Sequence, residues 1–176
     1  MALVTLSIDE IEQAREIGRA RHDHKWSWPV DWNEGKKTPR DVASEGAVCE
    51  MAYAKFWGLD IDRDLFERGK GDNGVDLQFP GGVTVDVKGS LDYTSGNLIL
   101  NELPPMPYLR LPHYYALCFK TESITTFALA GIVSAAEFFC RATVGDFGFG
   151  KRFKMHQSLL RPPEGLRAIT NLRPLA

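Results

Sequence analysis

Cysteine is scarce in this chain, and long apolar runs are missing. The three cysteines, Cys49, Cys118 and Cys140, are far apart, and no Cys-x-x-Cys pair occurs. A disulfide framework or a zinc site is therefore not indicated, and Cys49 and Cys118, which fall in apolar segments, are expected to be buried thiols. No run approaches the ~20 apolar residues of a membrane span, and no basic region precedes the short apolar run at the N-terminus. We expect a soluble, cytoplasmic protein that does not contact membranes.

A strong charge of one sign is missing too. The formal net charge is −2 over 176 residues, of which 44% are hydrophobic and 25% charged. This composition suits a single globular domain, and the charge neither indicates nor excludes a nucleic-acid partner. Residues 151–176 differ, because they contain six basic residues and one acid. We expect this basic C-terminal segment to contact phosphate groups of DNA, chiefly through Lys151, Arg152, Lys154 and Arg161.

Residues 74–89 carry the clearest pattern in the chain. Apolar residues alternate with polar ones on both sides of a turn at 80–82, namely Val75, Leu77 and Phe79 before it and Val83, Val85 and Val87 after it. This period of two predicts a β-hairpin. A two-residue turn would put the two apolar rows on opposite faces of the sheet. A three-residue turn keeps them on one face and sets Asp76 opposite Asp86.

The polar face of this hairpin is the first candidate site. Asp76 and Asp86 would lie side by side, with Lys88 two residues further on the same face. Like charges directly opposite each other destabilise a strand pair, so such a pair indicates a bound cation. Carboxylate oxygens suit Mg²⁺ or Mn²⁺. The alternative is an edge hairpin whose polar face is simply solvated.

Asp76, followed after a short gap by Asp86-Val87-Lys88, resembles the PD-(D/E)xK nuclease superfamily, notably its small stand-alone, phage-type members. Val75 stands where a proline is common in that family. The resemblance implies an α/β fold in which a mixed central β-sheet is flanked by helices, the restriction-endonuclease-like core. It also implies that Asp76 and Asp86 bind Mg²⁺ or Mn²⁺ together with the Val87 carbonyl, while Lys88 assists the attacking water.

A helix before the hairpin often supplies a further acid in this superfamily. The sequence predicts a helix over residues 40–57, capped by Asp41 or Ser44 and ended by Gly58. We favour Glu50 as the acid, since its neighbours on one helix face include Ala47 and Ala54, which are small enough to let the helix approach the sheet. Glu45 is the alternative, although a place in the first turn, next to the helix dipole, would explain it.

The remaining segments are assigned from local signals. Capping boxes at Ser7–Glu10 and Ser134–Glu137 predict helices that end near Arg21 and Arg141. Strands are expected at residues 114–120, 125–133 and 152–157. Irregular segments are expected at 22–39, which is rich in tryptophan, at 63–73, at 91–112 and at 145–152. In the loop 63–73 we expect Arg68 and Lys70 to contact phosphate.

Together these features predict one nuclease domain over residues 1–176. Residues 1–39 would form an N-terminal helix and a tryptophan-rich loop, residues 40–150 the core, and residues 151–176 the basic segment. The predicted activity is that of a Mg²⁺-dependent deoxyribonuclease or endonuclease, in the host cytoplasm if the chain is phage-encoded. An exonuclease or junction resolvase with the same site, and a non-catalytic DNA-binding or assembly protein, are the alternatives. A homodimer is left open.

Overall fold

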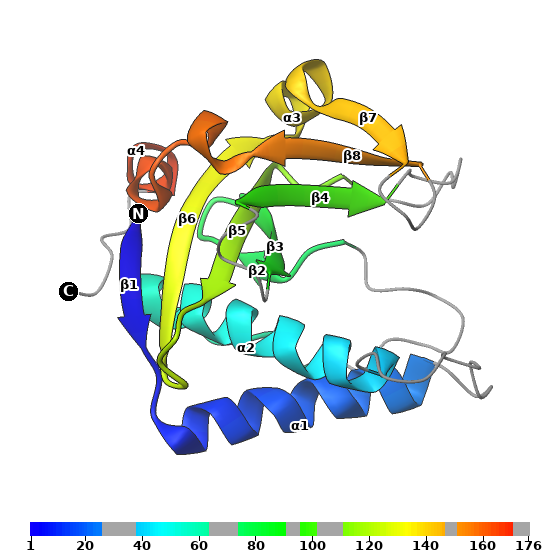
Figure 1. The fold of residues 1–176 in the computed structure, drawn as a ribbon. Coiled ribbons are helices and arrows are strands. Elements are labelled where there is room, and N and C mark those ends of the chain that lie inside the picture. Colours follow the sequence, from blue (N-terminus) through cyan, green and yellow to red (C-terminus); the bar gives the residue numbers. More distant parts are fainter. Residues whose placement is uncertain (26–37, 64–73, 91–95, 102–110, 147–150, 171–176) are drawn as a thin grey trace.

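The computed structural model describes residues 1–25, 38–63, 74–90, 96–101, 111–146 and 151–170 (Figure 1). One long helix, α2 (Pro39–Trp57), covers one face of a central mixed sheet and a second, α1 (Ile8–Lys25), packs against α2, while a smaller sheet and a short helix cover the other face. The predicted α/β architecture, a mixed central sheet flanked by helices, is confirmed at that level. The tryptophan-rich residues 26–37 and the loop residues 64–73, which include Arg68 and Lys70, lie outside the described residues.

The central sheet has five strands in the order β1-β6-β5-β3-β2. They are β1 (Ala2–Thr5), β2 (Leu77–Gln78), β3 (Thr84–Ser90), β5 (Tyr114–Lys120) and β6 (Thr126–Ser134). β3 and β5 run parallel, and the other neighbours are antiparallel. β5 is buried along almost its whole length, as its apolar run predicts. β1 was not predicted, because four residues at a sheet edge give too short a pattern.

The two long helices are α1 (Ile8–Lys25) and α2 (Pro39–Trp57). The Ser7 capping box is confirmed, since the Ser7 N–H donates to Glu10 Oε2 at 2.6 Å and the Glu10 N–H to Ser7 Oγ at 3.1 Å. The predicted cap of α2 is wrong, because Thr38 is the N-cap and Asp41 completes its capping box from inside the helix. Gly58 ends α2 with a φ of 66°, as expected.

Glycines set how closely these elements pack. A Cβ on Gly18 of α1 would lie 2.5 Å from the Ala43 carbonyl oxygen of α2, so only glycine fits there. A Cβ on Gly89 of β3 would lie 2.9 Å from Cys49 Sγ on α2. α2 is therefore held tightly between α1 and the sheet, and most of its residues from Ala47 onward are buried.

The second sheet has three strands in the order β4-β8-β7. They are β4 (Asn97–Asn101), β7 (Thr143–Asp146) and β8 (Lys151–His156), and α3 (Ala135–Arg141) lies beside them. β8 and α3 agree with the sequence analysis, and the Glu137 N–H donates to Ser134 Oγ at the predicted cap. β4 falls in the segment 91–112 and the second half of β7 in the segment 145–152, both of which were predicted to be irregular, and that prediction is wrong for these residues. β4 and β7 are both short outer strands, so the alternation of apolar and polar residues that would reveal a strand extends over only a few residues.

The chain continues from β8 through two 3₁₀ turns and a short helix, which are η1 (Gln157–Leu159), η2 (Pro163–Leu166) and α4 (Arg167–Thr170). Cys49 and Cys118 are buried free thiols, as predicted, and Cys140 is exposed. In the part of the chain that the structure describes, none of the helices has the length and apolar character needed to cross a membrane.

Candidate active site

The β2–β3 hairpin has the predicted register. Leu77 faces Val85, and the Phe79 N–H donates to the Val83 carbonyl at 2.8 Å. The turn between them has three residues. Its last two, Gly81 and Gly82, have φ values of 85° and 81°, at which a residue with a side chain would be strained. The length of this turn keeps the apolar rows on one face, where Leu77, Phe79 and Val85 are buried.

Asp76 lies at the point where pairing between β2 and β3 stops. Its N–H donates to the Val85 carbonyl at 3.0 Å, and its Oδ2 accepts the Val87 N–H at 2.6 Å. The Asp76 carboxylate therefore occupies the edge of β3 that β2 leaves uncovered. Since the N–H and C=O of a strand residue point to the same side, the Val87 carbonyl is directed to this edge too.

Burial and the charges of the other two predicted acids, Glu50 and Asp86, raise the pKa of Asp76. Burial of the carboxyl group raises the pKa of Asp76 well above its usual value, and the negative charges of Glu50 and Asp86 raise it further, while the charge of Lys88 lowers it. Asp86 is also within hydrogen-bonding reach of Asp76. Carboxylates from β3, from α2 and from the segment before β2 thus converge, although they are up to 36 residues apart in sequence.

Asp86 and Lys88 form the second part of the site. Asp86 is 6% exposed, and its Oδ1 lies 2.7 Å from Lys88 Nζ. The side chain of Lys88 is 39% exposed, so its ammonium group extends from a buried carboxylate toward the surface. Tyr115 of β5 is the register partner of Asp86. Burial and the Asp86 charge raise the pKa of Tyr115 to about 12.

Glu50 reaches the site from α2. At Gly89 the helix meets β3 through Gly46 and Cys49, and Trp57, seven residues after Glu50 and on the same face of α2, packs its ring against Phe79 of the hairpin with the ring centroids 5.5 Å apart. At about 100° per residue, Glu50 lies between the side of α2 that meets Gly89 and the side that meets Gly18 of α1. It is 8% exposed and stands on the seam where α1, α2 and the sheet edge come together.

The structure adds Arg21, which the sequence analysis treated only as a basic residue at the end of a helix. Its Nη1 lies 2.6 Å from Glu50 Oε2, and its Nη2 donates to the Asp62 carbonyl at 2.5 Å. Burial works against the charge, but Glu50, Asp76 and Asp62 outweigh it and raise the pKa of Arg21. A signal existed, because Arg21 follows Ala14 and Gly18 at helical spacing on the face of α1 that packs on α2.

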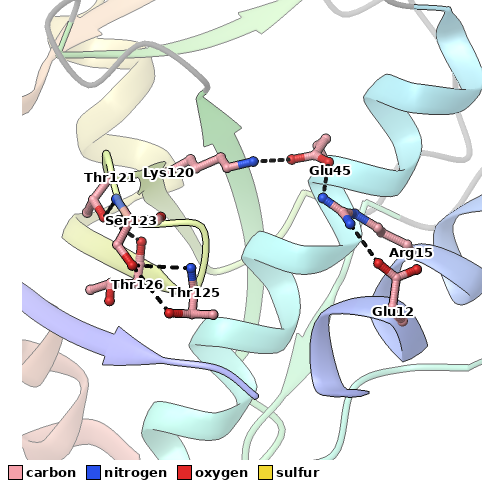
Figure 2. Close-up of polar contacts among 8 residues, drawn as sticks. All are labelled: Glu12, Arg15, Glu45, Lys120, Thr121, Ser123, Thr125 and Thr126. Atoms are coloured by element: carbon pink, nitrogen blue, oxygen red, sulfur yellow. Dashed lines mark hydrogen bonds and ion pairs between the residues drawn. The ribbon is translucent and has the colours of Figure 1, made fainter. Parts of the chain in front are cut away.

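Figure 2 shows Glu45 between Arg15 of α1 and Lys120 of β5. It is the seventh residue of α2 and not in the first turn, so the predicted dipole role is wrong. Its carboxylate pairs with Arg15 Nη2 of α1 at 3.1 Å and with Lys120 Nζ at the end of β5 at 3.6 Å. Arg15 is also bound to Glu12 at 2.7 Å. Glu45 therefore ties α1, α2 and β5 together, and it is absent from the charges that act on Asp76.

A cavity of about 600 Å³ adjoins Asp76. It is lined by the segment that follows α2 and by the hairpin, with Asp60, Ile61, Asp62, Arg63, Val75, Asp76 and Gln78 on its walls. Asp76 thus borders a space large enough for part of a substrate.

The donor set at this edge is suited to Mg²⁺ or Mn²⁺, because it consists of carboxylates and a backbone carbonyl. Among the residues that the structure describes, however, no three His, Cys, Asp or Glu side chains are arranged to enclose a metal. Two of the acids turn toward cations of the chain instead, since Glu50 binds Arg21 and Asp86 binds Lys88. The types of donor atom suit such an ion, and a bound metal would share these two carboxylates with Arg21 and Lys88.

The predicted phosphate-binding residues are divided between two places. On β8, Arg152 and Lys154 alternate with the buried Met155, so they belong to the outward face of the second sheet, and Lys151 is exposed at the start of the strand. Arg161 forms an ion pair with Glu137 at 2.9 Å. None of these residues is among the groups whose charges shift the pKa of Asp76.

The structure thus brings together four predicted residues, Asp76, Asp86, Lys88 and Glu50, and adds Arg21 from the N-terminal helix. They come from one helix pair and one hairpin, and they meet at the edge of β3 beyond its pairing with β2, beside the cavity. Comparison with family models, with curated proteins and with solved structures finds no match for this chain.

Proposed function

We propose that this protein is a divalent-metal-dependent deoxyribonuclease of the PD-(D/E)xK type, with a restriction-endonuclease-like core. The observation that supports this most is the state of Asp76, whose pKa is raised well above its usual value by burial and by Glu50 and Asp86. Three carboxylates around one sheet edge favour a bound cation, because they repel one another and the pairing of Glu50 with Arg21 and of Asp86 with Lys88 offsets this repulsion only in part. The mixed sheet, with α2 on one face and α1 packed against α2, is compatible with the fold that the resemblance implies.

In this proposal Asp76 and Asp86 hold Mg²⁺ or Mn²⁺ with the Val87 carbonyl, and Glu50 contributes directly or through water. A bound metal would polarise the scissile phosphate and lower the pKa of a water molecule. Lys88 would hold or help deprotonate the attacking water and offset the negative charge that develops on the phosphate. Its partly exposed side chain, 2.7 Å from Asp86, allows it to reach a phosphate at the surface.

The proposal is tested by incubating the protein with linear, circular, branched and single-stranded DNA in Mg²⁺, Mn²⁺ or EDTA. Cleavage is expected only with a metal, and the preferred DNA shape distinguishes an endonuclease from an exonuclease or a junction resolvase. Asp86→Asn should be inactive, because it removes the charge of a ligand and keeps its shape. The matched control is Asp146→Asn, the same substitution on the exposed strand β7, which should stay active. Full cleavage in EDTA would refute the proposal.

Lys88→Ala is expected to stop turnover and leave Mn²⁺ binding largely intact. An ammonium group cannot ligate a metal, and its removal frees the Asp86 carboxylate that it binds in the metal-free protein. Mn²⁺ titration followed calorimetrically, alongside the cleavage assay, measures both effects. A large loss of Mn²⁺ affinity in Lys88→Ala would show that its role in this mechanism is wrong.

The basic strand β8 is expected to contribute DNA affinity and not chemistry. Neutralising Lys151, Arg152 and Lys154 should weaken binding to DNA of any sequence. In a plot of the logarithm of the DNA-binding constant against the logarithm of the salt concentration, each lost phosphate contact should reduce the steepness of the slope by roughly 0.9 for duplex DNA. Binding assays at several salt concentrations measure the slope. An unchanged slope would place the DNA on another surface.

A further inference from the structure

Arg21 is a cation from α1 that enters the carboxylate cluster. Its guanidinium joins α2 to the segment that lines the cavity, because Nη1 binds Glu50 Oε2 at 2.6 Å and Nη2 donates to the carbonyl of Asp62, a lining residue, at 2.5 Å. Its side chain is 16% exposed and that of Glu50 is 11% exposed. Among the described residues its Nε is buried and has no partner. The burial of Arg21 is therefore offset chiefly by Glu50 and by Asp62.

The packing of the two helices fixes where Arg21 lies. Gly18, one turn before Arg21 on α1, touches the backbone of Ala43 and Ser44 so closely that a Cβ would not fit. This contact brings α1 as near to α2 as two helices can approach at that point. Arg21 is consequently held beside Glu50 by the backbone and not only by its own flexible side chain.

We propose that Arg21 is a positioning residue of this site, which holds the Glu50 carboxylate in place and limits, by its own fixed positive charge, how tightly the carboxylates hold a divalent cation. The part concerning the cation rests on the proposed function, and the part concerning Glu50 does not. The guanidinium suits this position because its planar fork can bind a carboxylate and a carbonyl at once. A lysine would keep the charge but could not bridge both groups in the same way.

The first experiment is made without metal, on the full chain in EDTA. Thermal unfolding is compared for Arg21→Met, Glu50→Gln and the double variant. If the two residues act as a pair, the double variant should lose no more thermal stability than Glu50→Gln alone. In Glu50→Gln the buried Arg21 remains without its charged partner, whereas in the double variant Arg21 is absent as well. The control is Arg19→Met, two residues earlier and about 200° around the helix, whose effect should simply add to that of Glu50→Gln. If the stability loss of the double variant equals the sum of the losses for Arg21→Met and Glu50→Gln, the positioning role is overturned.

The second experiment measures Mn²⁺ affinity and turnover. Arg21→Met should bind Mn²⁺ roughly five- to tenfold more tightly, because a nearby positive charge is removed. Its turnover should fall about 10- to 100-fold, since Glu50 is no longer oriented. Arg21→Lys should keep the wild-type Mn²⁺ affinity and recover part of the turnover, and Arg19→Met should change neither quantity. A merely structural role would not tighten Mn²⁺ binding.

Unchanged Mn²⁺ affinity in a folded Arg21→Met protein would overturn the proposed effect of the charge. If the wild-type protein binds no Mn²⁺, the proposed function and the charge effect both fail. The unfolding experiment in EDTA still decides separately whether Arg21 positions Glu50, so the two failures can be told apart.

Discussion

Asp76→Asn is expected to abolish metal-dependent cleavage and, in the absence of metal, to stabilise the protein near neutral pH. Several kcal/mol of transition-state stabilisation depend on the metal, so the loss of one charged ligand should cost about 10³-fold in rate. The Asn side-chain oxygen can still accept the Val87 N–H, so the local hydrogen bond is kept. Only the charge that repels Glu50 and Asp86 is removed.

The pH dependence of this stabilisation has a definite sign. The folded-state pKa of Asp76 lies above its unfolded value, so the folded protein binds the proton more tightly. The wild-type protein therefore loses stability as pH rises above the ordinary carboxyl pKa of about 4. Asp76→Asn lacks this loss, and its advantage in thermal unfolding should vanish below about pH 4, where both states are protonated. A variant less stable than the wild type at pH 7 in EDTA would contradict the account of Asp76.

Glu50→Gln is expected to reduce cleavage steeply and also to destabilise the metal-free protein. The sequence alone predicts that Glu50→Gln costs little stability or even increases it, because the substitution removes one of several buried negative charges. The structure reverses that expectation, because Glu50 is the charged partner of the largely buried Arg21. Leaving a buried charge unpaired should cost about 2 kcal/mol, less than for a fully buried pair because glutamine can still accept a hydrogen bond.

Glu45→Gln is the matched control for this variant. It is the same substitution on the same helix, and it weakens partly exposed pairs with Arg15 and Lys120. We expect a loss of about 1 kcal/mol or less and nearly unchanged cleavage. Denaturant unfolding and the DNA assay on both variants measure these effects. Loss of cleavage in Glu45→Gln, with Glu50→Gln active, would mean that the wrong acid of α2 has been assigned.

The parts of the fold that could be predicted from the sequence are those whose signals are local. The turn at 80–82 fixes the register of the hairpin through its length, and the capping boxes at Ser7 and Ser134 mark helix starts through contacts three residues apart. The strand at 114–120 was evident from its continuous apolar run. These features do not depend on the rest of the chain.

The parts that could not be predicted depend on distant contacts. Arg21 and Glu50 are 29 residues apart, and nothing near either residue indicates that a glycine contact brings them together. The close approach of Gly46 and Cys49 to Gly89 of β3 was not predicted for the same reason, since it follows from tertiary packing. The strands β4 and β7 were missed because they become strands by pairing with β8.

The central claim is that the acids around Asp76 hold a divalent cation, and Mn²⁺ titration of the wild-type protein and of Asp86→Asn tests it most directly. Calorimetry at neutral pH is expected to show saturable Mn²⁺ binding to the wild type. In folded Asp86→Asn that binding should be lost or greatly weakened, while Asp146→Asn should bind as the wild type does. Absence of saturable binding in the wild type, or equal affinity in Asp86→Asn, would contradict the claim.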